Sequence, residues 1–151
     1  AVHSNGLSPS MIGGDLGAAM KAAGIGGHVG PPTGYILRFS NGLVVYLSGD
    51  TGITGEQDKV VRGFYKAKLV VMNIGDTYTT GPTEAAYVIN ELIKPVSVIA
   101  SHANELATKG GQVLAGTRTD IFQKAVKVPV YIPLSGRTME FNSGGACVSG
   151  C

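Results

Sequence analysis

Three short apolar segments of this chain each lead to a polar residue that can bind a metal or move a proton. "LVVYL" leads to Asp50, "LVVMN" to Asp76 and "VSVIA" to His102, and the three polar residues are spaced 26 residues apart. Helix-like segments separate the apolar ones, and this alternation is typical of βαβ units with a partly parallel sheet. Open α/β sheets bind ligands outside the carboxyl ends of their strands. We therefore expect all three side chains at one edge of the sheet.

Any one of these polar residues could simply end a strand. Three in register, including one of only three histidines in the chain, favour a site.

The surrounding pattern predicts the rest of an α/β domain. Ser40-Asn41-Gly42 connects two apolar runs and signals a β-hairpin. Pro82 stands near the first turn of a predicted helix, a position that proline favours, and this helix carries one apolar face made of Ala85, Val88, Ile89 and Leu92. The predicted helices cover 55–67, 81–92 and 118–126, and further strands cover 34–39, 128–132 and 137–141.

Residues 4–34 are rich in Gly, Ser and Pro, with one helix-like interruption at 14–24. We expect them to form a long loop across one face of the protein, and long loops in compact domains are usually functional or disordered.

Composition narrows the function classes. Hydrophobic residues make up 44% of the chain and charged residues 15%, which favours a packed body over a disordered one. The net charge of +2 comes without a run of Lys or Arg, so no footprint for nucleic acid is present. No apolar run approaches the ~20 residues of a membrane span, and no membrane association is expected.

Cys147 and Cys151 lie four residues apart in a Gly/Ser-rich tail. They could form a small disulfide, which would fit an exported protein, or they could be free thiols. A zinc site there would need two further ligands that the neighbouring sequence does not offer.

The candidate ligands for a metal are His3, His28, His102, Asp50 and Asp76. Imidazole and carboxylate together suit Zn or Fe, and a carboxylate can bridge two ions ~3.5–4 Å apart. These side chains are too few for two complete coordination spheres.

Four segments together carry a family resemblance: "VHSNG", "GPPTGYILRFSNGLVVYLSGDTG", "VVMNIGDTYTTGPTEAAYVINEL" and "PVSVIASHANE". In this order and spacing they resemble the later part of metallo-β-lactamase-fold metal-dependent hydrolases, closest to the L-ascorbate-6-phosphate lactonase-like branch. The resemblance runs from about Ala1 to Glu105 and more weakly to Phe141. It implies an α/β fold, the C-terminal half of the αββα sandwich.

The resemblance also implies roles for single residues. His3 resembles the family's third-motif histidine, a ligand of the first metal. Asp50 resembles the catalytic aspartate that bridges both metals, and His102 resembles the last histidine, a ligand of the second. Asp76, Tyr78 and Thr80 correspond to a segment near the pocket and are assigned to substrate binding.

His28 departs from the family pattern, which more often has small or amide residues at this position. It is either an exposed loop histidine or a contact to the substrate.

The largest departure is the lack of the family's His-x-His-x-Asp-His cluster. We therefore expect residues 1–151 to be the C-terminal part of one domain, completed by an N-terminal segment that is cleaved or is a separate chain. The resemblance then implies two zinc ions in the completed site. Association of the chain into a homo-oligomer is a further possibility that the sequence leaves undecided.

The predicted function is that of a zinc-dependent hydrolase, in which a metal-bound hydroxide attacks a lactone, ester or amide bond of a small molecule. The alternative is a non-catalytic binding or assembly module that keeps the scaffold and has lost its metal.

Overall fold

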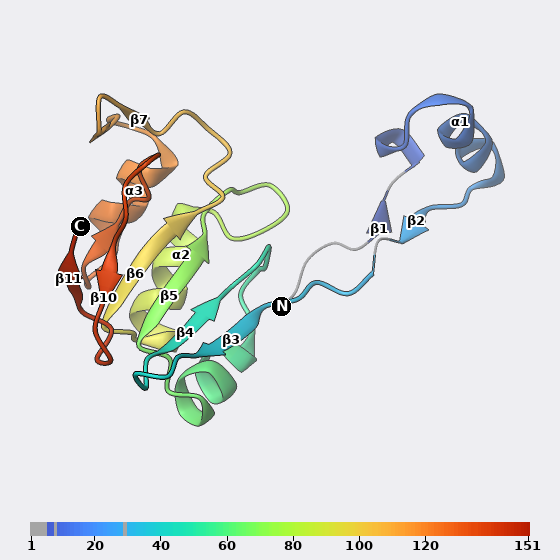
Figure 1. The fold of residues 1–151 in the computed structure, drawn as a ribbon. Helices are drawn as coiled ribbons and strands as arrows, with labels where there is room; N and C mark the ends of the chain where they lie inside the picture. The colour runs from blue at the N-terminus through green and yellow to red at the C-terminus, as the bar shows by residue number, and fades with distance from the viewer. Residues whose placement is uncertain (1–5, 8, 29) are drawn as a thin grey trace.

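A five-stranded sheet forms the centre of the protein in the computed structural model, which describes residues 6–7, 9–28 and 30–151 (Figure 1). The strand order is β3-β4-β5-β6-β9. β3 runs antiparallel to β4, and the other neighbours are parallel, as the alternating pattern predicts. The strands cover Tyr35–Arg38 (β3), Val44–Leu47 (β4), Leu69–Asn73 (β5), Ser97–Ser101 (β6) and Val130–Tyr131 (β9).

The predicted hairpin between β3 and β4 is confirmed. Gly42 adopts a left-handed φ of 88°, which glycine reaches without steric cost, and its N–H donates to the carbonyl of Phe39 (2.9 Å). Asn41 Oδ1 accepts from the N–H of Leu43 (3.0 Å). These local bonds fix the register in which Ile36 lies opposite Tyr46.

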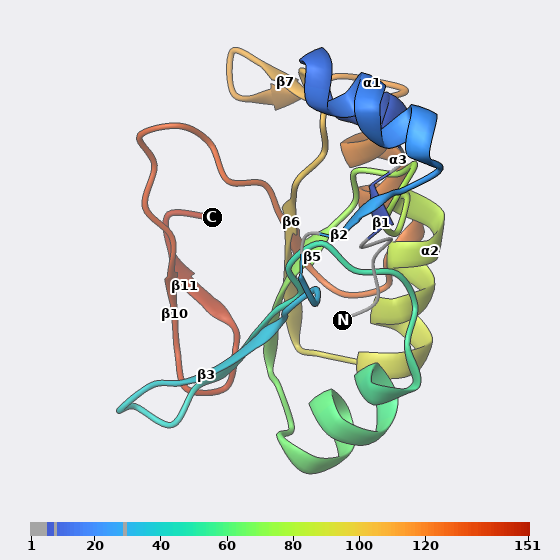
Figure 2. The ribbon, with the colours of Figure 1, turned by 90° about the vertical axis from the view of Figure 1, so that its right-hand side faces the viewer.

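Helices cover one face of this sheet (Figure 2). They are η2 (Gln57–Phe64), α2 (Pro82–Tyr87) continuing directly into η3 (Val88–Ile93), and α3 (Arg118–Ala125). In η2 and η3 the hydrogen bonds span five residues, as from the N–H of Lys94 to the carbonyl of Ile89. All three helices match the predicted ranges, and α2 begins at Pro82.

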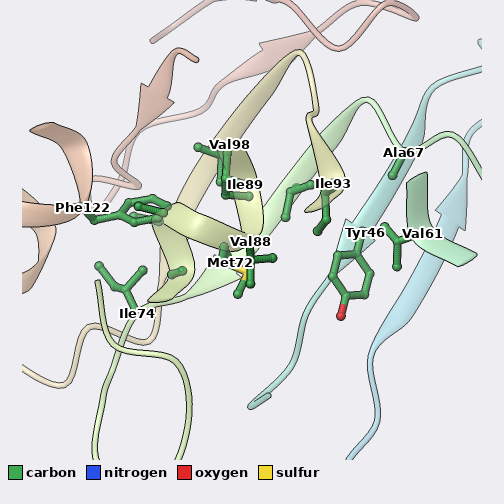
Figure 3. Close-up of a cluster of buried hydrophobic side chains, with 14 residues drawn as sticks. Tyr46, Val61, Ala67, Met72, Ile74, Val88, Ile89, Ile93, Val98 and Phe122 are labelled. Atoms are coloured by element: carbon green, nitrogen blue, oxygen red, sulfur yellow. The ribbon is translucent and has the colours of Figure 1, made fainter. Parts of the chain in front are cut away.

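The main core lies between the helices and the sheet (Figure 3). Its fully buried members come from the inward faces of both layers: Val70, Met72, Ile74, Ala85, Val88, Ile89, Ile93, Val98 and Phe122. Of the four residues predicted for the apolar face of the second helix, Ala85, Val88 and Ile89 are buried, and Leu92 packs partly buried against the same cluster.

The opposite face of the sheet is covered only in part. A hairpin of β10 (Glu140–Phe141) and β11 (Cys147–Ser149) lies on that side (Figure 2). Phe141 packs there against Leu43, Val45 and Leu69. Of the strand predicted at 137–141, only Glu140–Phe141 forms. It pairs with β11 and not with the central sheet, because the tail after it returns antiparallel. Cys147 and Cys151 form a disulfide, which settles the alternative left open by the sequence.

The described residues before β3 (6–7, 9–28 and 30–34) form an arm beside the body in place of the predicted loop across its face (Figure 1). The arm holds β1 (Gly6–Leu7), η1 (Pro9–Met11), α1 (Gly14–Ala23) and β2 (Gly27–His28). Only Gly17 is buried in α1, so the side chains of this helix are not packed on the sheet.

One small hairpin remains, formed by β7 (Thr108–Lys109) and β8 (Gln112–Val113). Within the described ranges, no helix is both long and apolar enough to cross a membrane.

Candidate functional site

The three predicted polar residues follow three strands that are adjacent and parallel. Asp50 comes three residues after β4, Asp76 three residues after β5 and His102 directly after β6. Since β4, β5 and β6 pair in parallel register, their carboxyl ends share one edge of the sheet. The predicted common edge is confirmed.

Asp50 and His102 meet at this edge. The Nδ1 atom of His102 lies 3.5 Å from Oδ1 of Asp50, and the two side chains are 42% and 50% exposed, respectively. They line an open depression of about 370 Å³ together with Tyr35, Leu47, Ser48, Gly49, Val71, Asn73 and Ser101. A carboxylate and an imidazole therefore face the same accessible space, 52 residues apart in the sequence.

A second depression of about 310 Å³ borders His102, with Ser101, Glu105 and Thr119 among its lining residues. His102 thus lines both depressions.

The backbone of these strand ends is unusual. Among the described residues, six that are not glycine have positive φ, and four of them are Asp76 (64°), Thr77 (68°), His102 (51°) and Asn104 (55°). Asp, His and Asn reach this region more easily than other residues, whereas at Thr77, a β-branched residue, it is a genuine outlier that costs on the order of 1–3 kcal/mol, and such strain clusters at functional sites. The left-handed conformations after β5 and β6 therefore support a site at this edge independently of side-chain chemistry.

Gly75 allows the loop after β6 to pack closely on the loop after β5. A Cβ at Gly75 would lie 2.7 Å from Nδ2 of Asn104 and 2.9 Å from Nδ1 of His102, and it would also clash with the carbonyl oxygen of His102. Such distances are closer than side chains tolerate, so only glycine fits here without moving His102.

Asp76 bonds within its own loop. Its Oδ1 accepts from the N–H of Thr77 (2.6 Å), and its N–H donates to the carbonyl of Thr80 (3.3 Å). The carboxyl group lies near Gly81, at the start of α2. The structure thus places Asp76 at the predicted edge but records no bond from it to Asp50 or His102.

The remaining substrate candidates take different positions. Tyr78 is half-exposed (53%) in the loop after β5. Thr80 is buried, and its hydroxyl hydrogen-bonds Asn73. A substrate contact by either residue stays a prediction.

Of the other two histidines, the structure describes only His28, which does not lie at this edge. His28 is exposed in β2, within the arm, and its Nδ1 accepts from the N–H of Gly30 (3.1 Å). His3 lies outside the described residues.

Ser48 and Asn73 are site residues that the sequence analysis missed. Both are buried and both line the depression beside Asp50. The sequence signal for them is the asparagine that ends "LVVMN". A side-chain amide at the end of a buried strand needs hydrogen-bond partners, so this residue predicts a polar network at the carboxyl end of β5.

The largest depression, about 540 Å³, lies between β3, β4 and η2 and includes none of the predicted site residues. Its buried polar side chains are engaged within the fold. Gln57 accepts from the N–H of Thr54 (2.9 Å) and donates to the carbonyl of Gly52 (3.2 Å). Burial raises the pKa of the Tyr46 hydroxyl, which therefore stays protonated. Volume alone does not make this depression a catalytic site, and we assign the site to the Asp50–His102 edge.

The donor set at that edge fits part of a metal centre. One carboxylate and one imidazole are ligands that zinc and iron accept. Across the described residues, no three or more His, Cys, Asp or Glu side chains gather closely enough to hold an ion by themselves. Asp50 and His102 could thus contribute ligands but not complete a coordination sphere.

Relatives of known class share much of this sequence. The chain is 41% identical over 73 residues to a UPF0173 metal-dependent hydrolase from Polaromonas sp., covering 48% of this chain and 26% of the relative. It is 34% identical over 115 residues to a UPF0173 metal-dependent hydrolase from Polynucleobacter asymbioticus, covering 74% of this chain and 38% of the relative. The predicted resemblance to metal-dependent hydrolases is confirmed. No protein-family model matches the chain.

One solved structure supports the fold, and a second aligns slightly less well. Igni18, a metallo hydrolase from Ignicoccus hospitalis, aligns with a TM-score of 0.50 at 20% identity, covering 77% of this chain and 61% of that one. A metallo-β-lactamase fold protein from Bacillus subtilis aligns with a TM-score of 0.48 at 14% identity, covering 72% and 49%. At such identities the likeness concerns the fold alone, and the predicted mixed α/β fold is confirmed.

The chain spans 26% and 38% of the lengths of the two hydrolases that it matches in sequence. The activity and substrate of the complete protein are therefore proposed below.

Proposed function

We propose that this chain supplies one side of a dinuclear zinc site in a hydrolase of small lactones, esters or amides. The observation that carries the proposal is the meeting of Asp50 and His102, 3.5 Å apart and half-exposed, at the carboxyl edge of parallel strands. The sequence relatives, which are metal-dependent hydrolases by description, support the same class.

The residues of this chain have distinct tasks in the proposed site. Asp50 has two carboxylate oxygens and can hold two cations at once, while His102 offers a neutral nitrogen to one of them. His3 is proposed as a ligand of the other ion. Bound zinc would lower the pKa of a water molecule and polarise the carbonyl of the substrate.

The depression beside Asp50 suits an uncharged substrate. Its described lining includes Tyr35, Leu47 and Val71 and no Lys or Arg. Two zinc ions could themselves balance the charge of a phosphodiester, so the choice of a lactone, ester or amide is based on the family resemblance and on the apolar part of this lining.

Completion of the site by an N-terminal segment of the same fold is part of the proposal. On the sheet face opposite the helices, Tyr35 lies opposite Leu47, and Leu37 lies opposite Val45. Tyr35 is 58% exposed and Leu37 39% exposed, and neighbouring Val71 is only partly buried. We propose that a second layer carrying the His-x-His-x-Asp-His cluster packs on this face and brings the missing ligands.

Metal analysis of the natively isolated protein tests the proposal, with mass spectrometry to find a co-purifying N-terminal segment. About two zinc ions per complex together with such a segment are expected. A native protein without metal would leave the non-catalytic binding or assembly module as the function, and would refute the hydrolase.

The variant Asp50→Ala addresses the role of this residue. We expect it to lose hydrolysis and at least one of the two zinc ions, because the bridging carboxylate is gone. Its free energy of unfolding without metal should stay within about 0.5 kcal/mol of wild type, since the side chain is half-exposed. Unchanged turnover of an ester or lactone substrate would contradict the assignment.

A further inference from the structure

We infer that Asn73 is a positioning residue that holds the Asp50 loop in place for metal binding. The inference rests on the proposed function, in which Asp50 is a metal ligand. It concerns how Asn73 and Ser48, which also line the depression, hold the loop that carries Asp50.

Asn73 is the last residue of β5 and is only 2% exposed. Its Oδ1 lies 3.0 Å from the hydroxyl of Ser48, which shares its single proton between this oxygen and the carbonyl of Gly49 (2.8 Å). Its Nδ2 donates to the carbonyl of Thr51 (3.1 Å) and to Oγ1 of Thr80 (3.0 Å). The carbonyl of Thr51 can only accept, so the amide nitrogen must face it. The Asn73 side chain thus binds residues on both sides of Asp50, which lies between Ser48 and Thr51.

Backbone groups of the same residues add further hydrogen bonds to this network. The N–H of Asn73 donates to Oγ of Ser48 (3.0 Å), and the hydroxyl of Thr80 donates to the carbonyl of Asn73 (2.9 Å). The N–H of Thr80 donates to the carbonyl of Thr51 (2.9 Å). The loops after β4 and β5 are therefore joined through one buried amide.

Only an amide satisfies these partners. The site requires one acceptor toward Ser48 and two donors toward Thr51 and Thr80, and a buried polar group left without its partner costs about 1–3 kcal/mol. An aspartate would set an oxygen against the carbonyl of Thr51. An apolar residue would remove one of the two hydrogen bonds that this carbonyl accepts and one acceptor of the Ser48 hydroxyl.

The consequence for Asp50 follows from its exposure. Its side chain is 50% exposed, so its location depends on the backbone that carries it more than on packing around it. Ser48 and Thr51 fix that backbone through Asn73. Loss of an outer partner of a metal ligand typically lowers metal affinity by about 10–100-fold.

A matched pair of serine variants tests this inference in the intact protein. Ser48 and Ser97 are both buried, 2% and 1% exposed, and each uses its hydroxyl within the fold. Ser48 lies at the carboxyl edge, whereas Ser97 begins β6 at the opposite edge and donates to the carbonyl of Gly145. Ser48→Ala, Ser97→Ala and Asn73→Asp are compared with wild type by titration with Zn²⁺ alone and by urea unfolding.

We expect Ser48→Ala and Asn73→Asp to raise the dissociation constant of Zn²⁺ by about 10–100-fold. Ser97→Ala should lose a similar amount of stability and keep wild-type affinity. Wild-type affinity in Ser48→Ala, or an equal loss in Ser97→Ala, would overturn the inference. If Asn73→Asp does not fold, Ser48→Ala decides alone.

The same Zn²⁺ titration distinguishes an error in the proposed function from an error in this inference. Wild-type protein that binds no Zn²⁺ would refute the metal site itself. Crystal structures of the metal-free serine variants would then decide the positioning role: displacement of Asp50 from His102 in Ser48→Ala but not in Ser97→Ala supports it, and an unmoved Asp50 refutes it.

Discussion

At the scale of single residues, the candidate site depends on a glycine as well as on the polar side chains. Gly75 has no side chain, and this lets the loop after β6 place His102 beside Asp50. The φ of Gly75 is not in the left-handed region, so space and not backbone conformation requires glycine here.

Gly75→Ala is therefore expected to displace His102 and to destabilise the protein by about 1–3 kcal/mol, the usual cost of overpacking. Urea unfolding measures the stability, and Zn²⁺ titration should show weaker binding.

Gly55→Ala is the control for this variant, because a Cβ there meets nothing within 4 Å and its φ is ordinary. It should leave stability equal or raised by up to about 1 kcal/mol. If both alanine variants behave alike, close packing at Gly75 does not position His102.

The residues of the site were only partly predictable. Asp50 and His102 could be found because each follows a recognisable apolar run, and a run of that kind implies a strand. The network through Asn73 could not be found in the same way, since its partners come from loops whose conformation depends on tertiary contacts. The left-handed backbone at His102 likewise leaves no pattern in the sequence.

At the scale of elements, the strands and helices of the sheet follow their sequence signals closely. β5 matches its predicted range, and the helix from Pro82 begins at the expected residue. Elements with little burial were the ones misjudged. The arm before β3 and the β10–β11 hairpin are placed by few contacts, so their sequences carry no periodicity that reveals where they pack.

Helix α3 has a capping arrangement that the sequence analysis did not use. Oγ1 of Thr117 accepts from the N–H of Asp120 (3.2 Å), and Oδ2 of Asp120 accepts from the N–H of Gly116 (2.9 Å). A hydrogen bond from Lys124 and the one from Gly116 lower the pKa of Asp120. Its carboxylate therefore stays charged at neutral pH beside the positive end of the helix.

Thr117→Ala should lower the free energy of unfolding by about 1 kcal/mol, because an N-cap oxygen is removed. Thr117→Ser keeps the oxygen and should retain most of the stability. Thermal and urea unfolding measure both variants, and an alanine variant as stable as the serine variant would speak against the cap.

At the scale of the whole molecule, the two faces of the sheet differ. One is sealed by helices around a core with fully buried side chains, and the other carries Tyr35 and Leu37 in the open beside a small hairpin. Contiguous exposed apolar surface of this kind marks interaction sites. The sequence could predict this asymmetry only through the family resemblance, because burial of a face depends on what packs on it.

Leu37→Asp is expected to weaken association with the proposed N-terminal segment at least about tenfold, a change of about 1.4 kcal/mol. Ile121→Asp is the control: Ile121 has similar exposure, 42% against 39%, but lies on α3 in the helix layer. Co-purification and light scattering measure the complex. Equal weakening by both variants would show that the N-terminal segment does not bind this face. If the chain forms a dimer that Leu37→Asp breaks, the face binds a second copy of the chain instead.

The left-handed conformations at Asp76 and His102 also decide how this protein can be dissected. A β-branched replacement at either position would alter the path of the chain as well as the chemistry, so its effect could not be attributed to the lost side chain. Asparagine tolerates this backbone region well. Asp76→Asn and His102→Asn therefore change the side-chain chemistry while keeping the backbone conformation accessible. A loss of metal in His102→Asn can then be attributed to the imidazole, and a loss of turnover in Asp76→Asn to the carboxylate.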